Sequence, residues 1–338
     1  MANRINLGII GAGRIGRLHA ENIIRHIPKA KIRIIADLYP DQVQTWAKDF
    51  DIPRITADYR EVLDDLNVEA VLICSSTDTH ADFIIEAAEA DKHIFCEKPI
   101  DLSIDRIKAA LAVVEQRGVK LQVGFNRRFD HNHRKVRDMV AGGKIGEPHI
   151  IQITSRDPSP PPMDYLNVSG GLFLDMTIHD FDMARFLSGS EVEEVYALGD
   201  VLIDPAIGQA GDIDTAIVTL KFASGAMGVI NNSRRATYGY DQRVEVFGSK
   251  GGVLNRNDTP SSAILSTGEG VISEKPKYFF LERYKESFIL EMMAFIDAVL
   301  CDADPPVDGE DGLKAALIAV AARESLKQNR PVKIGEID

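Results

Sequence analysis

Cysteine and long apolar runs are scarce in this sequence. The three cysteines, Cys74, Cys96 and Cys301, are widely spaced and form no CxxC pair. Neither a disulfide framework nor a thiolate zinc site is therefore indicated, and a reducing cytoplasm is the expected location. No apolar run reaches the roughly eighteen residues of a membrane span, and the first residues, MANRINLGIIGAG, lack the regions of a signal peptide. We therefore expect no membrane partner.

Positive charge is also in short supply, because the formal net charge is −12. A broad nucleic-acid-binding face needs clustered Lys and Arg, so no nucleic-acid partner is expected. An anionic cofactor is not excluded, since the N-terminus of a helix can supply local positive potential.

The first 125 residues alternate short apolar runs with amphipathic stretches of helical spacing. The apolar runs predict buried strands at residues 5–10, 31–37, 70–76, 93–98 and 120–125. Alternation of strand and helix is typical of a parallel sheet with right-handed crossovers. A Rossmann-type dinucleotide-binding domain is therefore predicted over residues 1–125.

The pattern changes after residue 125. A strand at 149–157 leads into a proline-rich loop, and residues 170–189 predict one helix that ends at Gly189. Strand-like runs joined by short turns follow and indicate a large open, mostly antiparallel sheet. Two helices are predicted in the tail, and the last can pack back on the first domain. The fold class is thus α/β, with the Rossmann domain followed by an α+β domain over residues 126–338 that is expected to bind substrate and form oligomers.

GAGRIG at residues 11–16 fits the pattern G-x-G-x-x-G between a predicted strand and a predicted helix. The first Gly allows a tight turn, the second lets a pyrophosphate approach the backbone, and the third lets the helix pack on the strand. A purely structural turn is the alternative. The turn residues expected to contact the cofactor are Gly11, Gly13, Arg14, Ile15 and Gly16.

Asp37 ends the second predicted strand, about twenty residues after the last Gly of the turn. A carboxylate at that position accepts hydrogen bonds from the adenosine ribose and repels a 2′-phosphate. Leu38 and Tyr39 follow, with no Arg to hold such a phosphate, so NAD is favoured over NADP. A solvated strand-end carboxylate is the alternative.

Three further side chains indicate proton and hydride chemistry. Lys98 follows the fifth strand at its carboxyl end, where ligands bind in open α/β sheets. Asp175 and His179 are four apart on a predicted helix, so both project from one face. A His beside a carboxylate suits proton transfer from an alcohol. The alternatives are a surface Lys, a core His and a metal pair; no further His or Cys cluster is nearby, so no metal is expected.

Together these motifs resemble the glucose–fructose oxidoreductase and inositol dehydrogenase (Gfo/Idh/MocA) family over nearly the whole chain. Its most specific marks are EKP at 97–99 and the D-x-x-x-H pair in GGLFLDMTIHDFD at 170–182. SSTDTH at 75–80 and GFNRRFD at 124–130 also match. The stretches SRDPSPPP at 155–162 and NNSRRATYGYDQRVEVFGSKGG at 231–252 are similar to the inositol 2-dehydrogenase branch in particular.

The resemblance implies roles for individual residues. Lys98, Asp175 and His179 match the family's catalytic trio: His179 takes the hydroxyl proton, Asp175 orients the substrate and assists His179, and Lys98 hydrogen-bonds the reacting oxygen. Further positions match the cofactor-binding loops, namely Ser75, Thr77, His80, Glu97 and Lys98. Positions that match the substrate site, besides the trio, are Arg127, Arg128, Asp157 and Tyr238, with only one of the two arginines expected to reach it.

The resemblance thus implies NAD-dependent oxidation of myo-inositol at the axial 2-hydroxyl to 2-keto-myo-inositol (scyllo-inosose), in a homotetramer formed through the open sheet. The close alternative is another inositol isomer, such as scyllo- or chiro-inositol, or an aldose. Two other classes stay open: a non-catalytic NAD-binding regulator, and NAD-assisted glycoside cleavage. The presence of both Lys98 and His179 argues against the regulator.

Overall fold

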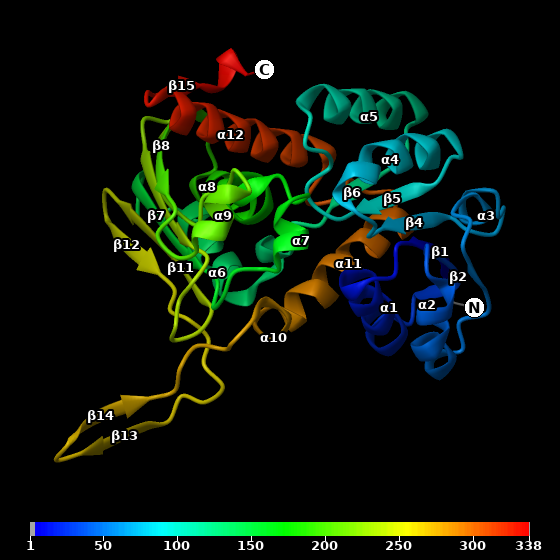
Figure 1. Ribbon diagram of the computed structural model, residues 1–338, viewed down its shortest axis with the longest axis horizontal. Helices are drawn as coiled ribbons and strands as arrows, with labels where there is room; N and C mark the ends of the chain where they lie inside the picture. Colours follow the sequence, from blue (N-terminus) through cyan, green and yellow to red (C-terminus); the bar gives the residue numbers. More distant parts are fainter. Residues whose placement is uncertain (1–3, 338) are drawn as a thin grey trace. The chain divides into compact units, whose positions relative to one another are not determined.

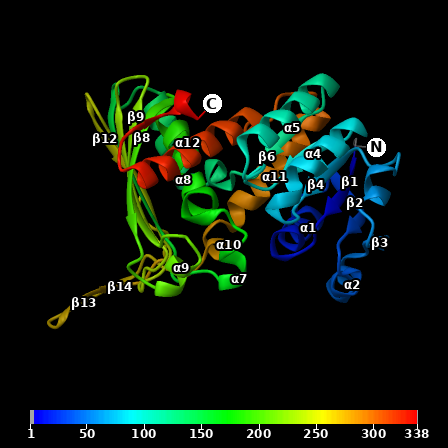
Figure 2. The ribbon, with the colours of Figure 1, turned by 45° about the horizontal axis from the view of Figure 1, so that its top comes forward.

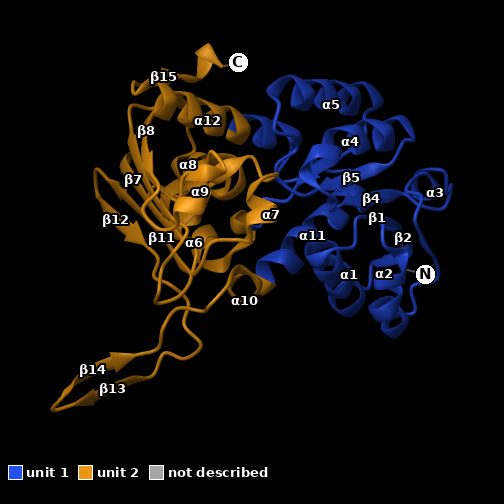
Figure 3. Cartoon of the chain, in the orientation of Figure 1, with its two compact units in different colours: residues 1–126, 286–314 blue, residues 127–285, 315–338 orange. Residues whose placement is uncertain are grey.

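The computed structural model describes residues 4–337, which divide into two compact units (Figure 3). Unit 1 comprises residues 1–126 and 286–314, and unit 2 comprises residues 127–285 and 315–338. The sequence predicts a single division at residue 125 and does not assign the segment 286–314 to the first unit. Among the residues that the structure describes, no helix is both long enough and apolar enough to cross a membrane.

Unit 1 is built on a parallel six-stranded sheet with the order β3-β2-β1-β4-β5-β6. Its central strands are apolar and almost fully buried, as expected for strands covered on both faces. This strand order is that of the dinucleotide-binding Rossmann fold, with the crevice between β1 and β4 at the switch point. The strands are β1 (Ile5–Ile10), β2 (Ala30–Ala36), β3 (Ile55–Thr56), β4 (Ala70–Ile73), β5 (His93–Cys96) and β6 (Leu121–Val123).

Helices connect the strands of unit 1, and one comes from much later in the chain. Met292, Phe295 and Ile296 of α11 (Lys285–Leu300) share one apolar cluster with Ile9 and Leu72 of the sheet. Helix α11 therefore completes the core of unit 1. The other helices of this unit are α1 (Arg14–His26), α2 (Pro40–Ala47), α3 (Arg60–Leu63), α4 (His80–Glu89) and α5 (Ile104–Arg117), labelled in Figure 1.

Unit 2 contains a seven-stranded sheet with the order β12-β11-β7-β10-β9-β8-β15. Its pairs are antiparallel except β7 with β10, which run parallel. The predicted mostly antiparallel sheet is thus confirmed. The strands are β7 (Pro148–Arg156), β8 (Val192–Asp200), β9 (Thr215–Phe222), β10 (Met227–Ser233), β11 (Asp241–Gly248), β12 (Gly251–Leu254) and β15 (Val332–Lys333).

Helices of unit 2 lie on one face of this sheet (Figure 2). The strands alternate between buried and exposed residues, as in a sheet with one covered face. The exposed face includes Ile150, Ile217 and Phe247, which are 40%, 51% and 47% exposed. A separate hairpin, β13 (Ile264–Thr267) and β14 (Gly270–Ser273), projects from the unit (Figure 1). The helices are α6 (His131–Ala141), α7 (Met163–Leu166), α8 (Ile178–Ser188), α9 (Pro205–Gln209), α10 (Phe280–Arg283) and α12 (Gly309–Gln328), which begins in unit 1.

The helix predicted over 170–189 is not regular throughout. It ends at Gly189 as expected, where a positive φ of 67° suits glycine. Residues Phe173–Thr177, however, form a π-helical turn before α8 begins at Ile178. Asp175 therefore lies in the π-turn and His179 in the first turn of α8, and their shared face stays a prediction. π-Turns of this kind are frequent at functional sites.

Candidate functional site

The turn between β1 and α1 has the geometry of a phosphate cradle. Gly11 has φ +88°, and a Cβ on it would lie 2.5 Å from the backbone nitrogen of Ser75. A Cβ on Gly16 would lie 2.1 Å from the carbonyl oxygen of Gly11, so helix and strand approach closely there. At Gly13, by contrast, a Cβ would meet nothing within 4 Å. Helix α1 begins at Arg14, and the N–H groups of its first residues, Arg14 and Ile15 among them, have no partner within the helix. These groups and the space at Gly13 fit a pyrophosphate.

Asp37 directly follows β2, and the backbone holds its carboxylate in place. The amide of Ala12 donates to Oδ2 at 2.7 Å, and the amide of Tyr39 donates to Oδ1 at 2.8 Å. Each oxygen keeps a second lone pair with which it can accept a ribose hydroxyl. The carboxylate is thus fixed beside the glycine turn, which fits NAD.

The loop after β4 supplies three of the predicted cofactor contacts. Ser75 Oγ lies 2.7 Å from Thr79 Oγ1, and Thr77 begins a short 3₁₀ turn. His80 is 2% exposed, and its two ring nitrogens lie 2.8 Å and 3.1 Å from the carbonyl oxygens of Pro99 and Ser75. His80 therefore ties this loop to the EKP turn, while its role in cofactor binding stays a prediction, as do those of Ser75 and Thr77.

The EKP turn follows β5. Glu97 turns inward, and its Oε1 lies 2.8 Å from Nε2 of His19 on α1. Its carboxylate also lies against Gly124, where a Cβ would come within 3.0 Å of Oε2. The half-buried Lys98 comes next, with a cis peptide bond to Pro99. Glu97 is thus held by protein groups on one side of the turn that carries Lys98.

In unit 2, the predicted catalytic carboxylate Asp175 is held from two sides. The hydroxyl of Tyr165 donates to Oδ1 at 2.7 Å, and Arg234 Nη1 donates to Oδ2 at 3.3 Å. Arg234 is 1% exposed and also reaches Asp212 at 3.3 Å. Asp175 is therefore rigidly oriented, as a residue that positions a substrate or a neighbouring His requires. His179 lies in the first turn of α8 and is half-buried.

The two candidate arginines have separate carboxylate partners on α8. Arg127 donates to Asp180 at 2.6 Å, and both residues are buried. Arg128 forms a forked pair with Asp182.

Arg127 also lies near Asp157. Burial raises the pKa of Asp157 to about 7, and the nearby charge of Asp175 raises it further, whereas the charges of Arg234 and Arg127 lower it. Arg127 thus belongs to the neighbourhood of Asp157 and Asp175, which favours Arg127 over Arg128 as the arginine of the site.

Tyr238 takes part in a more exposed network. Its hydroxyl donates to Asp241 Oδ2 at 2.6 Å and accepts from Arg156 Nη1 at 3.0 Å. Burial and the neighbouring Asp241 raise the pKa of Tyr238, so its hydroxyl keeps its proton. Tyr238 as a whole is 40% exposed. Its contact with a substrate stays a prediction.

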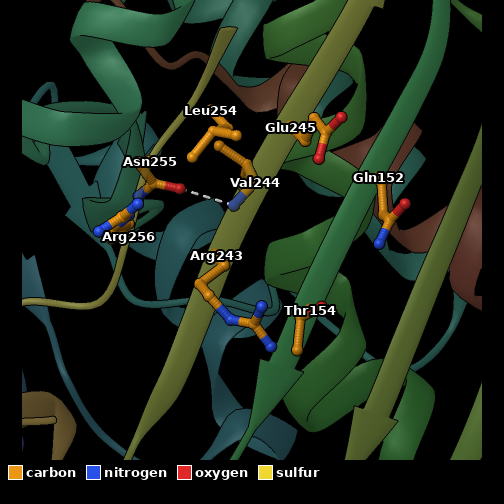
Figure 4. Close-up of a pocket in the computed structure, with 8 residues that line it drawn as sticks. All are labelled: Gln152, Thr154, Arg243, Val244, Glu245, Leu254, Asn255 and Arg256. Atoms are coloured by element: carbon orange, nitrogen blue, oxygen red, sulfur yellow. Dashed lines mark hydrogen bonds between the residues drawn. The ribbon is translucent and has the colours of Figure 1, made fainter. Parts of the chain in front are cut away.

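A shallow hollow on the seven-stranded sheet, drawn in Figure 4, is a different place from the predicted site. It is lined by side chains of β7, β11 and the segment 254–256, and Asn255 Oδ1 accepts from the amide of Val244 at 2.6 Å. Its lining includes Gln152, Arg243 and Glu245 but none of the predicted catalytic or cofactor residues.

Sequence reasoning missed the residues that support the predicted ones. Arg234 and Tyr165 hold Asp175, and His19 holds Glu97. Arg234 lies within the stretch 231–252 that carries the resemblance, so a signal for it was present. His19 is three residues after the glycine motif, with no pattern that links it to Glu97.

Comparison with known proteins agrees with these features. Residues 5–125 match the family described as "Oxidoreductase family, NAD-binding Rossmann fold", and residues 133–254 match the GFO/IDH/MocA C-terminal domain. The chain belongs to the Gfo/Idh/MocA oxidoreductase family. The predictions of this family, of the fold class, of an oxidoreductase and of NAD as cofactor are thereby confirmed.

Several full-length relatives of this Gfo/Idh/MocA protein are known. The myo-inositol 2-dehydrogenase of Thermotoga maritima is 49% identical over 98% of this chain and 99% of its own. The crystal structure of a probable dehydrogenase from Thermotoga maritima has a TM-score of 0.97 and covers 99% of this chain and 100% of its own at 49% identity. That of scyllo-inositol dehydrogenase from Lactobacillus casei, with bound NAD(H) and scyllo-inositol, has a TM-score of 0.92 at 31% identity and covers 98% of this chain and 99% of its own.

Proposed function

We propose that this protein oxidises myo-inositol at its axial 2-hydroxyl to 2-keto-myo-inositol (scyllo-inosose), with NAD as the oxidant. The observation that carries the proposal is the fixed Asp175, held by Tyr165 and Arg234 close in sequence to His179. Full-length identity of 49% to a myo-inositol 2-dehydrogenase supports the choice of substrate.

Each residue of the trio has a defined task in this proposal. Bound NAD supplies the hydride acceptor. His179 takes the hydroxyl proton, and Asp175 orients the substrate and His179. Lys98 donates a hydrogen bond to the reacting oxygen and lowers its proton affinity. Gly11, Gly13, Gly16 and the first residues of α1 hold the pyrophosphate, and Asp37 holds the ribose.

The remaining predicted residues bind the other hydroxyl groups of the ring. A polyol needs several donors and acceptors, which arginine, carboxyl and phenol groups supply. Arg127 and Asp157 take this part in unit 2, and Tyr238 adds a hydroxyl at the more exposed side. With a pKa of about 7, Asp157 can donate or accept a hydrogen bond at neutral pH.

The proposal predicts that purified protein given NAD and myo-inositol forms NADH, measured by absorbance. Lys98→Ala and His179→Ala should each lower turnover by about a hundredfold to ten-thousandfold, since each removes a group that acts on the reacting hydroxyl. His179→Ala, which is at none of the predicted cofactor positions, should leave NAD affinity largely intact. Lys108→Ala removes an exposed lysine of α5 and should keep full activity. No NADH with any inositol or sugar would refute the proposal.

A scyllo-inositol dehydrogenase is the second candidate, since relatives of that name match nearly the whole chain at 31% to 35% identity. The two isomers differ in the orientation of one hydroxyl. Initial rates across a panel of myo-, scyllo- and chiro-inositol and aldoses decide between them. A kcat/KM for scyllo-inositol above that for myo-inositol would overturn myo-inositol as the preferred substrate.

We further propose that the protein forms a homotetramer through the open face of the seven-stranded sheet. Apolar side chains on that face are exposed, and a face of this kind usually packs against a partner. The double variant Ile217→Glu/Phe247→Glu should shift the mass in light scattering from tetramer to smaller species, whereas Leu66→Glu, at an exposed position of unit 1, should not. We place the protein in the cytoplasm, in keeping with its three free cysteines.

A further inference from the structure

Three ionisable side chains from distant parts of the sequence meet inside unit 1. His19 comes from α1, Glu97 from the end of β5, and Glu291 from α11 (Figure 3). One ring nitrogen or carboxylate oxygen of each lies within 4.8 Å of those of the other two. The long separations mean that only the folded unit 1 brings these groups together.

The cluster is almost completely shielded from solvent. His19 and Glu291 are 0% exposed, and the Glu97 side chain is 14% exposed. The rings of Phe95 and Phe288 pack against the imidazole, at 5.1 Å and 5.9 Å between centroids. His19 Nε2 contacts Glu97 at 2.8 Å. Among residues 4–337, neither carboxylate oxygen of Glu291 has a hydrogen-bond partner. His19 Nδ1 has none there either.

The surroundings of Glu291 disfavour a negative charge. Burial is the main cause that raises its pKa, and the charge of Glu97 adds to it. A further titratable group near the cluster is Cys74, and its thiol pKa is raised mainly by burial and then by the charge of Glu97. Gln122 donates to the backbone carbonyl of Glu291, not to its carboxylate. An ionised Glu291 would thus be a buried charge beside a second carboxylate, which is unfavourable.

We propose that Glu291 is a neutral carboxylic acid which, together with His19, positions the Glu97 side chain and through it the turn that carries Lys98. The Glu97 carboxylate then keeps its contact with His19 Nε2 at 2.8 Å. The carboxylate is pressed against Gly124 on the other side, so the turn is held between α1, α11 and β6. Glu291 is a positioning residue, and the part about Lys98 rests on the proposed function.

The protonation of Glu291 is tested by infrared spectroscopy of protein carrying ¹³C-labelled glutamate, whose carbonyl bands shift to lower frequency, whereas those of Asp157 and the other aspartates do not. The spectrum is recorded at pH 7, which is far above the ordinary glutamic acid pKa of about 4.3. The wild type should still show the carbonyl stretch of a protonated glutamic acid. Glu291→Gln should abolish the band, and Glu286→Gln, an exposed position of the same helix, should keep it. Absence of the band in the wild type would overturn the proposal, even if the variant fails to fold.

The positioning role is tested by comparing two variants of Glu291. Glu291→Gln keeps a neutral hydrogen-bonding group and should retain kcat within about threefold, whereas Glu291→Ala should lose about tenfold to a hundredfold, the usual cost of misplacing a catalytic group. Equal losses in both variants would overturn the role. Stoichiometric divalent metal in purified protein, lost in Glu291→Gln, would overturn the neutral acid. If the wild type oxidises no inositol, the proposed function fails, while the infrared result and the NAD affinity of the two variants still decide this proposal.

Discussion

Three buried acids of unit 2 pair with arginines, whereas the buried Glu291 of unit 1 lies beside a histidine and a second carboxylate. In unit 2, Asp180 and Asp182 on α8 pair with Arg127 and Arg128, and Asp130 pairs with Arg283. All three carboxylates are at most 1% exposed. Arginine suits such pairs, since its guanidinium is always charged and binds carboxylates in a forked geometry.

The predicted cofactor site of unit 1 consists mainly of backbone groups. The glycine turn provides space and N–H groups, and Asp37 is held by the amides of Ala12 and Tyr39. Its buried Glu291 faces Glu97 and His19. Where no permanent cation is present, an added proton on one acid is the simplest way to keep the interior neutral.

This difference determines where each unit is sensitive to substitution. In unit 2, loss of one ionic partner leaves an uncompensated charge, which costs stability throughout the unit. In unit 1, the glycine turn depends on the absence of side-chain atoms, and at Gly13, where a Cβ meets no protein atom within 4 Å, an added methyl group should affect binding more than folding.

The largest effect is expected from Arg127→Met, which removes the charge that faces Asp180 and keeps a similar volume. Burial raises the pKa of Asp180, whereas Arg127 and Asn232 stabilise its ionised form. Without Arg127, the free energy of unfolding should fall by about 3–5 kcal/mol, the usual cost of breaking a buried pair. Urea unfolding followed by circular dichroism measures it.

Two further variants separate this cost from a simple loss of packing. Arg134→Ala removes an exposed arginine of α6 and should change stability by less than about 0.5 kcal/mol. The double variant Arg127→Met/Asp180→Asn should recover part of the loss, because it also removes the stranded carboxylate. A double variant less stable than Arg127→Met would show that the charge of Asp180 is not the cause.

A smaller, pH-dependent effect is expected at Asp157, whose pKa is raised from 3.8 to about 7, chiefly by burial. A raised folded-state pKa contributes stability that is full below pH 3.8 and is lost as the pH rises through about 7. Asp157→Asn stays neutral, so its stability relative to the wild type should rise by about 2–4 kcal/mol between pH 4 and pH 8. Urea unfolding at several pH values gives this difference.

Asp138→Asn is the matched control for Asp157→Asn, since it removes an exposed carboxylate of the same unit. Its stability relative to the wild type should not change with pH. A flat difference for Asp157→Asn as well would mean that Arg127 and Arg234 keep Asp157 ionised in the folded protein.

The parallel sheet of unit 1 was predictable from sequence because its signals are local. Short apolar runs mark β1 and β4, and the glycine spacing between β1 and α1 reflects contacts within a few residues. The place of Asp37 at the end of β2 was predictable for the same reason, since this strand end lies at a set distance from the turn. These local patterns predict the parallel sheet and the glycine turn, whereas the strand order comes from the structure.

Tertiary contacts explain what sequence reasoning missed. Nothing local to Glu291 indicates that α11 packs in the core of unit 1 or that its carboxyl faces Glu97. Arg127 and Arg128 are adjacent arginines that the sequence does not distinguish. Only the folded structure shows that Arg127 pairs with Asp180 of α8 and Arg128 with Asp182. The π-turn at Phe173–Thr177 has no counterpart in the apolar spacing, which reads as a regular helix.

The smallest effect on stability, and the most specific test of the backbone cradle, is expected at Gly13. Its φ of −64° is open to any residue and a Cβ there meets nothing within 4 Å, so Gly13→Ala should unfold like the wild type. The added methyl group enters the space assigned to the pyrophosphate, so NAD affinity should fall about tenfold, or about 1.4 kcal/mol, by calorimetry.

Gly16→Ala provides the contrast within the same turn. Its Cβ would lie 2.1 Å from the carbonyl oxygen of Gly11, so the helix must shift and the free energy of unfolding should fall by about 1–3 kcal/mol. Gly13→Ala thus separates binding from folding, whereas Gly16→Ala affects folding first. If Gly13→Ala bound NAD as tightly as the wild type, the pyrophosphate would lie elsewhere, and unit 1 would no longer differ from unit 2 in building its site from the backbone.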